Sequence, residues 1–131
     1  MTDQQVQLLR QSFAQLEQHE HQFVDLFYDR LFEIAPDARS LFPSDLKAQK
    51  TKLFAALKLV VHGIERFDAL RPALREMGQR HRSYGVVWED YGLVGEALVQ
   101  ALGQVLGEAA DAATEDAWYL AYTAVSDAMN G

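Results

Sequence analysis

Cysteine is absent from the 131 residues of this chain, and its absence narrows the chemistry that the chain can support. Without thiols the chain forms neither a disulfide framework nor a thiolate metal site. A metal must therefore be held by histidine, by carboxylates or by a prosthetic group.

Positive charge and long apolar runs are also scarce. Twelve Lys and Arg residues face nineteen Asp and Glu residues, and the net charge of -7 argues against nucleic-acid binding, which needs a basic face. No run of about 18 apolar residues indicates a membrane span. The N-terminal segment "MTDQQVQLLR" lacks the positive-then-apolar layout of a signal peptide, so the expected location is cytoplasmic.

The length suits one domain, and we expect it to cover residues 1–131. The chain shows no internal repeat, low-complexity tract or interdomain linker. A domain of this size buries roughly two thirds of the surface that its unfolded chain exposes. A core with room for a ligand is therefore within reach.

Helical periodicity runs through almost the whole chain, and no strand-like alternation of useful length competes with it. The sequence predicts an all-α fold of about seven helices, one of which Pro72 opens and which carries His81. The other expected helices cover residues 4–18, 20–34, 36–42, 46–64, 89–107 and 117–128.

Three polar residues interrupt the apolar faces of these helices: Tyr28, Gln49 and His81. Each alone has an ordinary interpretation, since a tyrosine can keep its hydroxyl at the surface, a glutamine can face water and a core histidine can be satisfied by neighbours. Together they place one polar group from each of three helices toward a common interior. That arrangement is how a buried polar site is built.

A single core histidine, without thiols or a carboxylate cluster on the same faces, does not make a four-ligand metal site. One histidine is sufficient for haem, because the porphyrin supplies four nitrogens and the protein adds one axial ligand. Haem is therefore the simplest chemical fit to these residues.

Three segments carry a resemblance to a known family. They are "FYDRLFEIAPDARSLF" at 27–42, the stretch around Gln49 and Leu53, and "GQRHRSYGVVWEDYGLVGEAL" at 78–98. Over nearly its whole length the chain resembles bacterial single-domain globins and the haem domain of flavohaemoglobins. The resemblance implies a globin fold, a three-over-three helical sandwich around a pocket for haem b.

The resemblance also implies roles for individual residues. His81 matches the proximal histidine, the metal ligand, whose other ring N–H should bond a backbone carbonyl. Tyr28, Gln49 and Leu53 match the distal pocket, where the first two would donate hydrogen bonds to dioxygen and the third would limit the space. Phe42 matches the phenylalanine that packs against the porphyrin.

Further residues are expected around the cofactor. The apolar lining would come from Leu57, Val86, Val94 and Leu98, although any core residue has a similar pattern. Lys52, Arg80 and Arg82 are candidates to pair with the haem propionates, against the alternative that they are solvated surface charges. The remaining histidines, at positions 19, 21 and 62, are expected at the surface.

One departure from the flavohaemoglobin pattern bears on mechanism. Tyr91 matches a tyrosine that, in that branch, is tied to the proximal histidine together with a glutamate, which strengthens the electron donation of the histidine to iron. The alignment puts the glutamate just beyond Gly131, so peroxidase-like chemistry is not expected. The chain also shows no Gly-rich nucleotide fingerprint for a flavin or NAD reductase.

Three functions stay open at this point. The first is reversible dioxygen binding at a five-coordinate haem iron, for storage, delivery or scavenging, with dioxygen or another diatomic gas as ligand. The second is an enzyme, a nitric oxide dioxygenase that forms nitrate and depends on a separate reductase. The third is a haem-free interaction or sensor domain on the same scaffold, which has no need for an imidazole at position 81.

Overall fold

The computed structural model describes residues 1–131 as six α-helices and three short 3-10 helices without any strand, so the all-α prediction is confirmed. In chain order the elements are α1 (Asp3–Glu17), α2 (Glu20–Ile34), η1 (Pro36–Leu41), α3 (Lys47–Gly63), η2 (Ile64–Arg66), α4 (Phe67–Ser83), α5 (Trp88–Leu106), η3 (Gly107–Ala109) and α6 (Ala112–Met129).

The helix boundaries agree with the sequence except at two starts. The prediction that Pro72 opens a helix is wrong, because α4 begins at Phe67 and contains Pro72. Proline has no N–H to give the carbonyl of Asp68, but Asp68 is exposed and water can bind that oxygen. The last helix begins five residues before position 117, since Asp111 caps it by accepting a 2.9 Å bond from Thr114 N.

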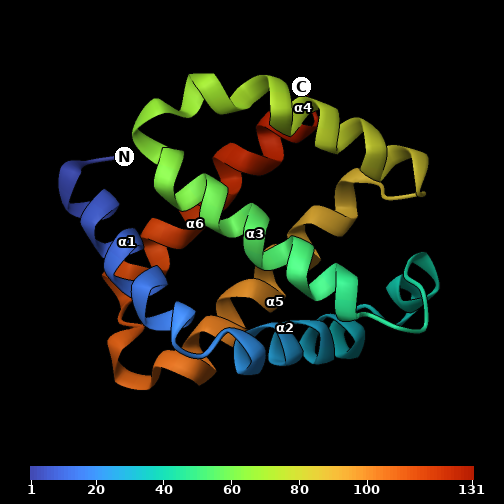
Figure 1. The fold of residues 1–131 in the computed structure, drawn as a ribbon, viewed down its shortest axis with the longest axis horizontal. Helices are drawn as coiled ribbons and strands as arrows, with labels where there is room; N and C mark the ends of the chain where they lie inside the picture. The colour runs from blue at the N-terminus through green and yellow to red at the C-terminus, as the bar shows by residue number, and fades with distance from the viewer.

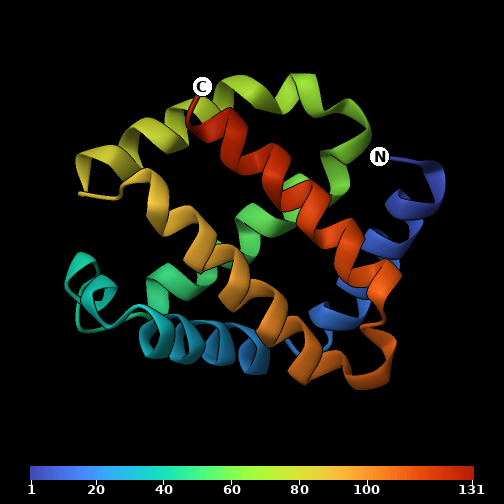
Figure 2. The same ribbon diagram turned by 180° about the vertical axis from the view of Figure 1, so that it is seen from behind.

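The helices pack in two layers. Figure 1 shows α3 crossing the near face with α5 and α6 behind it, and Figure 2 shows α5 and α6 side by side from the back. In both views α2 and α4 lie along opposite edges, and the C-terminus lies against α4. The most extensive helix contacts join α2 to α5, α4 to α6 and α1 to α6.

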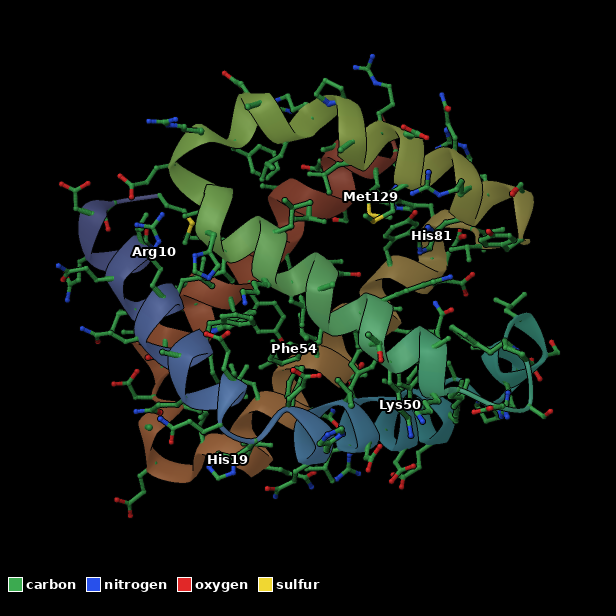
Figure 3. The ribbon with its side chains drawn as sticks, viewed as in Figure 1. Arg10, His19, Lys50, Phe54, His81 and Met129 are labelled. Atoms are coloured by element: carbon green, nitrogen blue, oxygen red, sulfur yellow. The ribbon has the colours of Figure 1, made fainter.

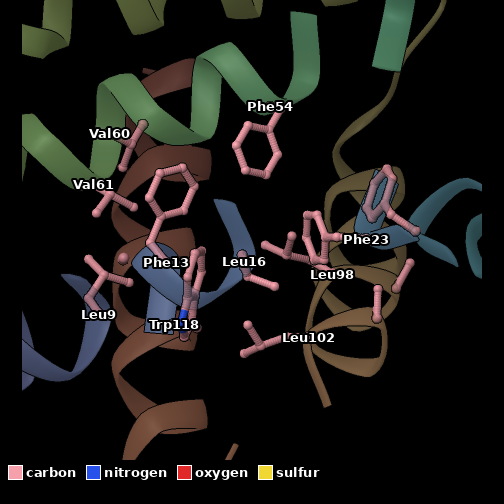
Figure 4. Packing of buried hydrophobic residues seen from close by; sticks show 14 of the residues in the cluster. Leu9, Phe13, Leu16, Phe23, Phe54, Val60, Val61, Leu98, Leu102 and Trp118 are labelled. Atoms are coloured by element: carbon pink, nitrogen blue, oxygen red, sulfur yellow. The ribbon is translucent and has the colours of Figure 1, made fainter. Parts of the chain in front are cut away.

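The core lies where α1, α2, α3, α5 and α6 meet (Figure 4). Phe13 stacks on Phe54 with ring centroids 5.1 Å apart, and Phe13 also lies 6.4 Å from the ring of Trp118. Phe54 is buried although the predicted apolar face of α3 passes through its neighbour Leu53, which is half-buried. Thus α3 turns one edge to the core and leaves the adjacent edge half-buried.

Ser12 and Trp118 form a buried hydrogen bond between α1 and α6, with Trp118 Nε1 donating to Ser12 Oγ over 2.8 Å. We expect Ser12→Ala to lower the free energy of unfolding by about 1–3 kcal/mol, because the buried indole N–H loses its acceptor. Urea unfolding followed by circular dichroism measures the change. A stability equal to that of the parent chain would contradict this account of the α1–α6 contact.

Candidate functional site

His81 lies near the C-terminal end of α4 and is half-buried. Its Nδ1 lies 2.6 Å from the carbonyl oxygen of Met77, one turn earlier in the same helix. Because a carbonyl oxygen only accepts, Nδ1 carries the proton in this contact, and Nε2 keeps its lone pair. The imidazole is therefore held in the tautomer and orientation that a metal ligand requires.

The segment that follows His81 reverses the chain sharply. Gly85 has φ +97°, a left-handed conformation that glycine adopts without strain. Gly85 N donates to Arg82 O and Val86 N donates to His81 O, both over 3.1 Å, which is the Schellman pattern of helix ends. This turn places Val86, a predicted lining residue, directly beside His81.

Tyr28 is buried in α2 at 3% exposure. Burial raises the pKa of Tyr28 to about 12, and the nearby Gln49 side chain partly opposes the rise. The structure thus brings Tyr28 and Gln49 together from α2 and α3. A tyrosine with this pKa stays protonated, and therefore a hydrogen-bond donor, throughout the physiological range.

Aromatic side chains pack around Tyr28. The ring of Phe42 meets it edge-on with centroids 5.6 Å apart, and Phe32 lies 5.9 Å from it. Phe32 also packs edge-on against Phe42 at 5.7 Å, and the Arg39 guanidinium covers its ring at 5.2 Å. Sequence reasoning missed Phe32, although its spacing of four residues from Tyr28 places both on one helix face.

The other residues expected to line the pocket differ in burial. Leu98 is fully in the core at 4% exposure. The remaining ones are half-buried and pack at the margin of the core rather than inside it: Leu53, Leu57, Val86 and Val94. Apolar side chains that are neither in the core nor at the surface are what borders a ligand site.

The three basic candidates are placed differently. Lys52 is exposed on α3, and Arg80 is exposed and forms an ion pair with Glu76 over 3.0 Å. Arg82 reaches α6, where its Nη1 donates to the carbonyl oxygen of Met129 over 3.2 Å. Of the three, only Arg82 is tied to another helix through its side chain.

Tyr91 is buried in α5, and its hydroxyl is the one buried side-chain polar atom without a hydrogen-bond partner. Burial raises the pKa of Tyr91, and the charge of Arg82 opposes the shift. The backbone oxygen of Tyr91 accepts a 2.6 Å bond from Tyr122 Oη, which ties α6 to α5.

The donor set fits a haem better than a bare ion. No group of three or more His, Cys, Asp or Glu side chains converges to hold a metal, so an ion at His81 needs its other ligands from a macrocycle. The oriented imidazole, the half-buried apolar border, and the Tyr28 and Gln49 donors supply what a haem pocket requires. Two surface hollows lie elsewhere. One, of about 540 Å³, is lined by α5 and α6, and the other, of about 490 Å³, is lined by the N-terminal segment, η2, the start of α4 and α6.

The raised pKa of Tyr28 predicts a loss of stability in alkali. The folded chain holds this proton up to pH of about 12, whereas an ordinary tyrosine releases it at 10.0. The stabilisation is thus fully present below pH 10.0 and is lost as the pH rises to about 12. We expect the free energy of unfolding, measured with urea across this range, to fall less in Tyr28→Phe. An equal fall in both proteins would contradict the assignment.

Comparison with known proteins defines the family. The globin family model matches residues 25–129. The chain is 31% identical over 129 residues to a flavohemoprotein of Bacillus subtilis, and 28% identical over 134 residues to one of Rhizobium meliloti. These matches cover 96% and 100% of this chain but 32% and 33% of the relatives. The chain therefore spans about a third of the length of these curated relatives.

Solved structures share the fold of this chain. An engineered carbene transferase, built on a Rhodothermus marinus protein provisionally assigned as a nitric oxide dioxygenase, is 34% identical with a TM-score of 0.85, covering 97% of this chain and 89% of that one. A bacterial globin from Campylobacter jejuni shares the fold at 24% identity and a TM-score of 0.86, covering 98% and 96%.

The fold and the oriented imidazole thus define a helical protein of the haem-binding class. The chain belongs to the globin family. Membership of the globin family implies that the chain binds haem. The similar Bacillus subtilis protein is itself named a flavohemoprotein. None of its helices combines the length and the hydropathy needed to cross a bilayer.

Proposed function

We propose that this chain binds haem b through His81 and holds dioxygen or another diatomic gas reversibly. The 2.6 Å contact of His81 Nδ1 with Met77 O carries the proposal. It leaves Nε2 free to bind iron and fixes the orientation of the ring relative to α4. Haem supplies the iron at which a gas binds.

The gas-binding side of the pocket would be formed by Tyr28, Gln49 and Leu53. Tyr28 lies on α2 and Gln49 on α3, and the two side chains interact. Helix α2 lies at the edge of the molecule opposite α4, which carries His81 (Figures 1 and 2). Hydroxyl and amide donors stabilise a ligand that carries partial negative charge. Half-buried Leu53, one turn after Gln49, would restrict the space beside the ligand.

The remaining residues would hold the cofactor. Phe42, with Tyr28 and Phe32 against its ring, would present a flat apolar surface to the porphyrin. Leu57, Val86, Val94 and Leu98 would complete the apolar lining, and Lys52 would face the propionates. Arg82 would not, because its guanidinium is held by the carbonyl oxygen of Met129. The proposed domain covers residues 1–131, since α1 lies before the matched range and packs on α6.

A second candidate function is nitric oxide dioxygenation, which the 34% identical Rhodothermus marinus relative favours. In that reaction nitric oxide and dioxygen combine with one electron to give nitrate. The pocket needs the same two donors, and the electron would come from a separate reductase. The relatives of about three times this length are named for flavin as well as haem, which supports a flavin protein as that partner.

Spectroscopy of the haem-loaded protein tests the proposal. Titration of the purified chain with haem should give a Soret band that saturates at one haem per chain, and the ferrous form should take up and release dioxygen reversibly. Absence of the Soret band would overturn haem binding. Sustained nitric oxide consumption with a flavin reductase, many turnovers per haem, would favour the enzyme over the carrier.

A further inference from the structure

Helices α4 and α6 touch backbone to backbone at one buried glycine. Gly78 is buried, and a Cβ atom built on it would lie 1.8 Å from Met129 O and 2.5 Å from Met129 C. Both atoms belong to the main chain, so no side-chain rotation relieves the overlap. Any larger residue at position 78 would push the two helices apart.

The same carbonyl makes a second contact with α4. Arg82 lies one turn after Gly78, on the same helix face, and its Nη1 donates to Met129 O over 3.2 Å. Met129 is the last residue of α6, where carbonyl groups lack intrahelical donors and a cation is favourable. One carbonyl oxygen therefore fixes α4 both by close packing and by a charged hydrogen bond.

His81 lies between these two contacts in the chain. Figure 3 shows His81 and Met129 close together where the end of α6 meets α4. The bond to Met77 O fixes the imidazole relative to its own helix only. The position of the ring relative to α2 and α5 then depends on where α4 packs, and the most extensive contacts of α4 are with α6.

The end of α6 is itself well anchored. Asn130 Nδ2 donates to Ser126 O over 2.7 Å and Asn130 N donates to the same oxygen over 3.1 Å, which closes the last turn. About two turns earlier, Tyr122 Oη donates to Tyr91 O on α5. The helix that carries Met129 is thereby tied to the helix that carries Val94 and Leu98.

We propose that Gly78 and Arg82 are positioning residues, which use the Met129 carbonyl as a fixed point to set the distance of His81 from the haem iron. The inference rests on the proposed ligation of iron by His81. Only glycine allows this approach, and only a long donor at position 82 reaches the carbonyl. The iron–histidine bond would therefore report the α4–α6 contact.

The test compares Gly78→Ala with Gly103→Ala in the haem-loaded ferrous protein. Gly103 lies inside α5 and an added Cβ meets nothing within 4 Å, so it controls for the change of glycine to alanine in a helix. We expect Gly78→Ala to shift the iron–histidine stretching band in the resonance Raman spectrum and to accelerate haem loss by about 10-fold, as outer-sphere changes do. Gly103→Ala should leave both unchanged.

The outcomes separate this proposal from the one it rests on. An unshifted band in Gly78→Ala, with the band present in the parent protein, would overturn the positioning role. Absence of the band from the parent protein would instead overturn ligation by His81. Should Gly78→Ala fail to fold, Arg82→Leu and Arg82→Lys replace it: a shift in Arg82→Leu that Arg82→Lys reverses supports the proposal, and no shift overturns it.

Discussion

Replacement of His81 by alanine should weaken haem binding by at least about 100-fold. Loss of an outer-sphere partner of a metal ligand already costs about 10- to 100-fold in affinity, and His81→Ala removes the ligand itself. No other histidine is placed to replace it, since His19, His21 and His62 are all exposed. The Met77 carbonyl would also lose its imidazole partner.

Haem transfer to an acceptor globin measures this change through the rate of decay of the Soret band. His21→Ala is the matched control, because His21 is exposed on α2 and its removal should not alter haem retention. Imidazole added to His81→Ala should restore part of the spectrum by entering the space left by the side chain. A normal proximal-histidine spectrum in His81→Ala without imidazole would place the ligand elsewhere.

Tyr28→Phe should accelerate dioxygen dissociation about 10-fold or more. A hydrogen bond to a charged acceptor contributes about 1.5–3 kcal/mol, and about 1.4 kcal/mol corresponds to a factor of ten. The substitution keeps the aromatic ring and its edge-on contacts with Phe27 and Phe42, at 4.9 and 5.6 Å. The change in rate therefore reports the lost hydroxyl rather than a lost wall of the pocket.

Stopped-flow dissociation of dioxygen from the oxygenated protein gives the rate. Tyr119→Phe, which removes a hydroxyl from the exposed face of α6, is the control and should dissociate at the parental rate. Gln49→Leu should also accelerate dissociation, and because Tyr28 and Gln49 interact, the effects in the double variant should not be additive. An unchanged rate in Tyr28→Phe would remove this residue from the gas-binding role.

The sequence predicted most of the fold because helical periodicity and helix caps are local properties. Thr2 and Gln5 form the capping box that begins α1, with bonds of 2.8 and 3.1 Å in the two directions. The start of α4 could not be predicted in the same way. Pro72 has the features of a first-turn residue, but tertiary packing holds α4 together across the missing hydrogen bond.

The candidate site was partly visible in the sequence, because a polar residue on an apolar helix face is conspicuous. That criterion predicts Tyr28, Gln49 and His81 as site residues. The criterion does not detect Phe32, whose role comes from its contacts with Tyr28 and Phe42. It also misses Gly78, since a small residue inside a helix shows its purpose only when the neighbouring helix is in place.

By itself the sequence determined the helical class and the absence of thiol chemistry, and it singled out three polar residues as candidates for a site. These follow from composition and from patterns within single helices. Only the tertiary structure decided that Tyr28 and Gln49 meet, that Arg82 bonds α6 and that Met129 O touches Gly78. Such contacts join residues from different helices, and helix packing depends on how all the faces fit at once.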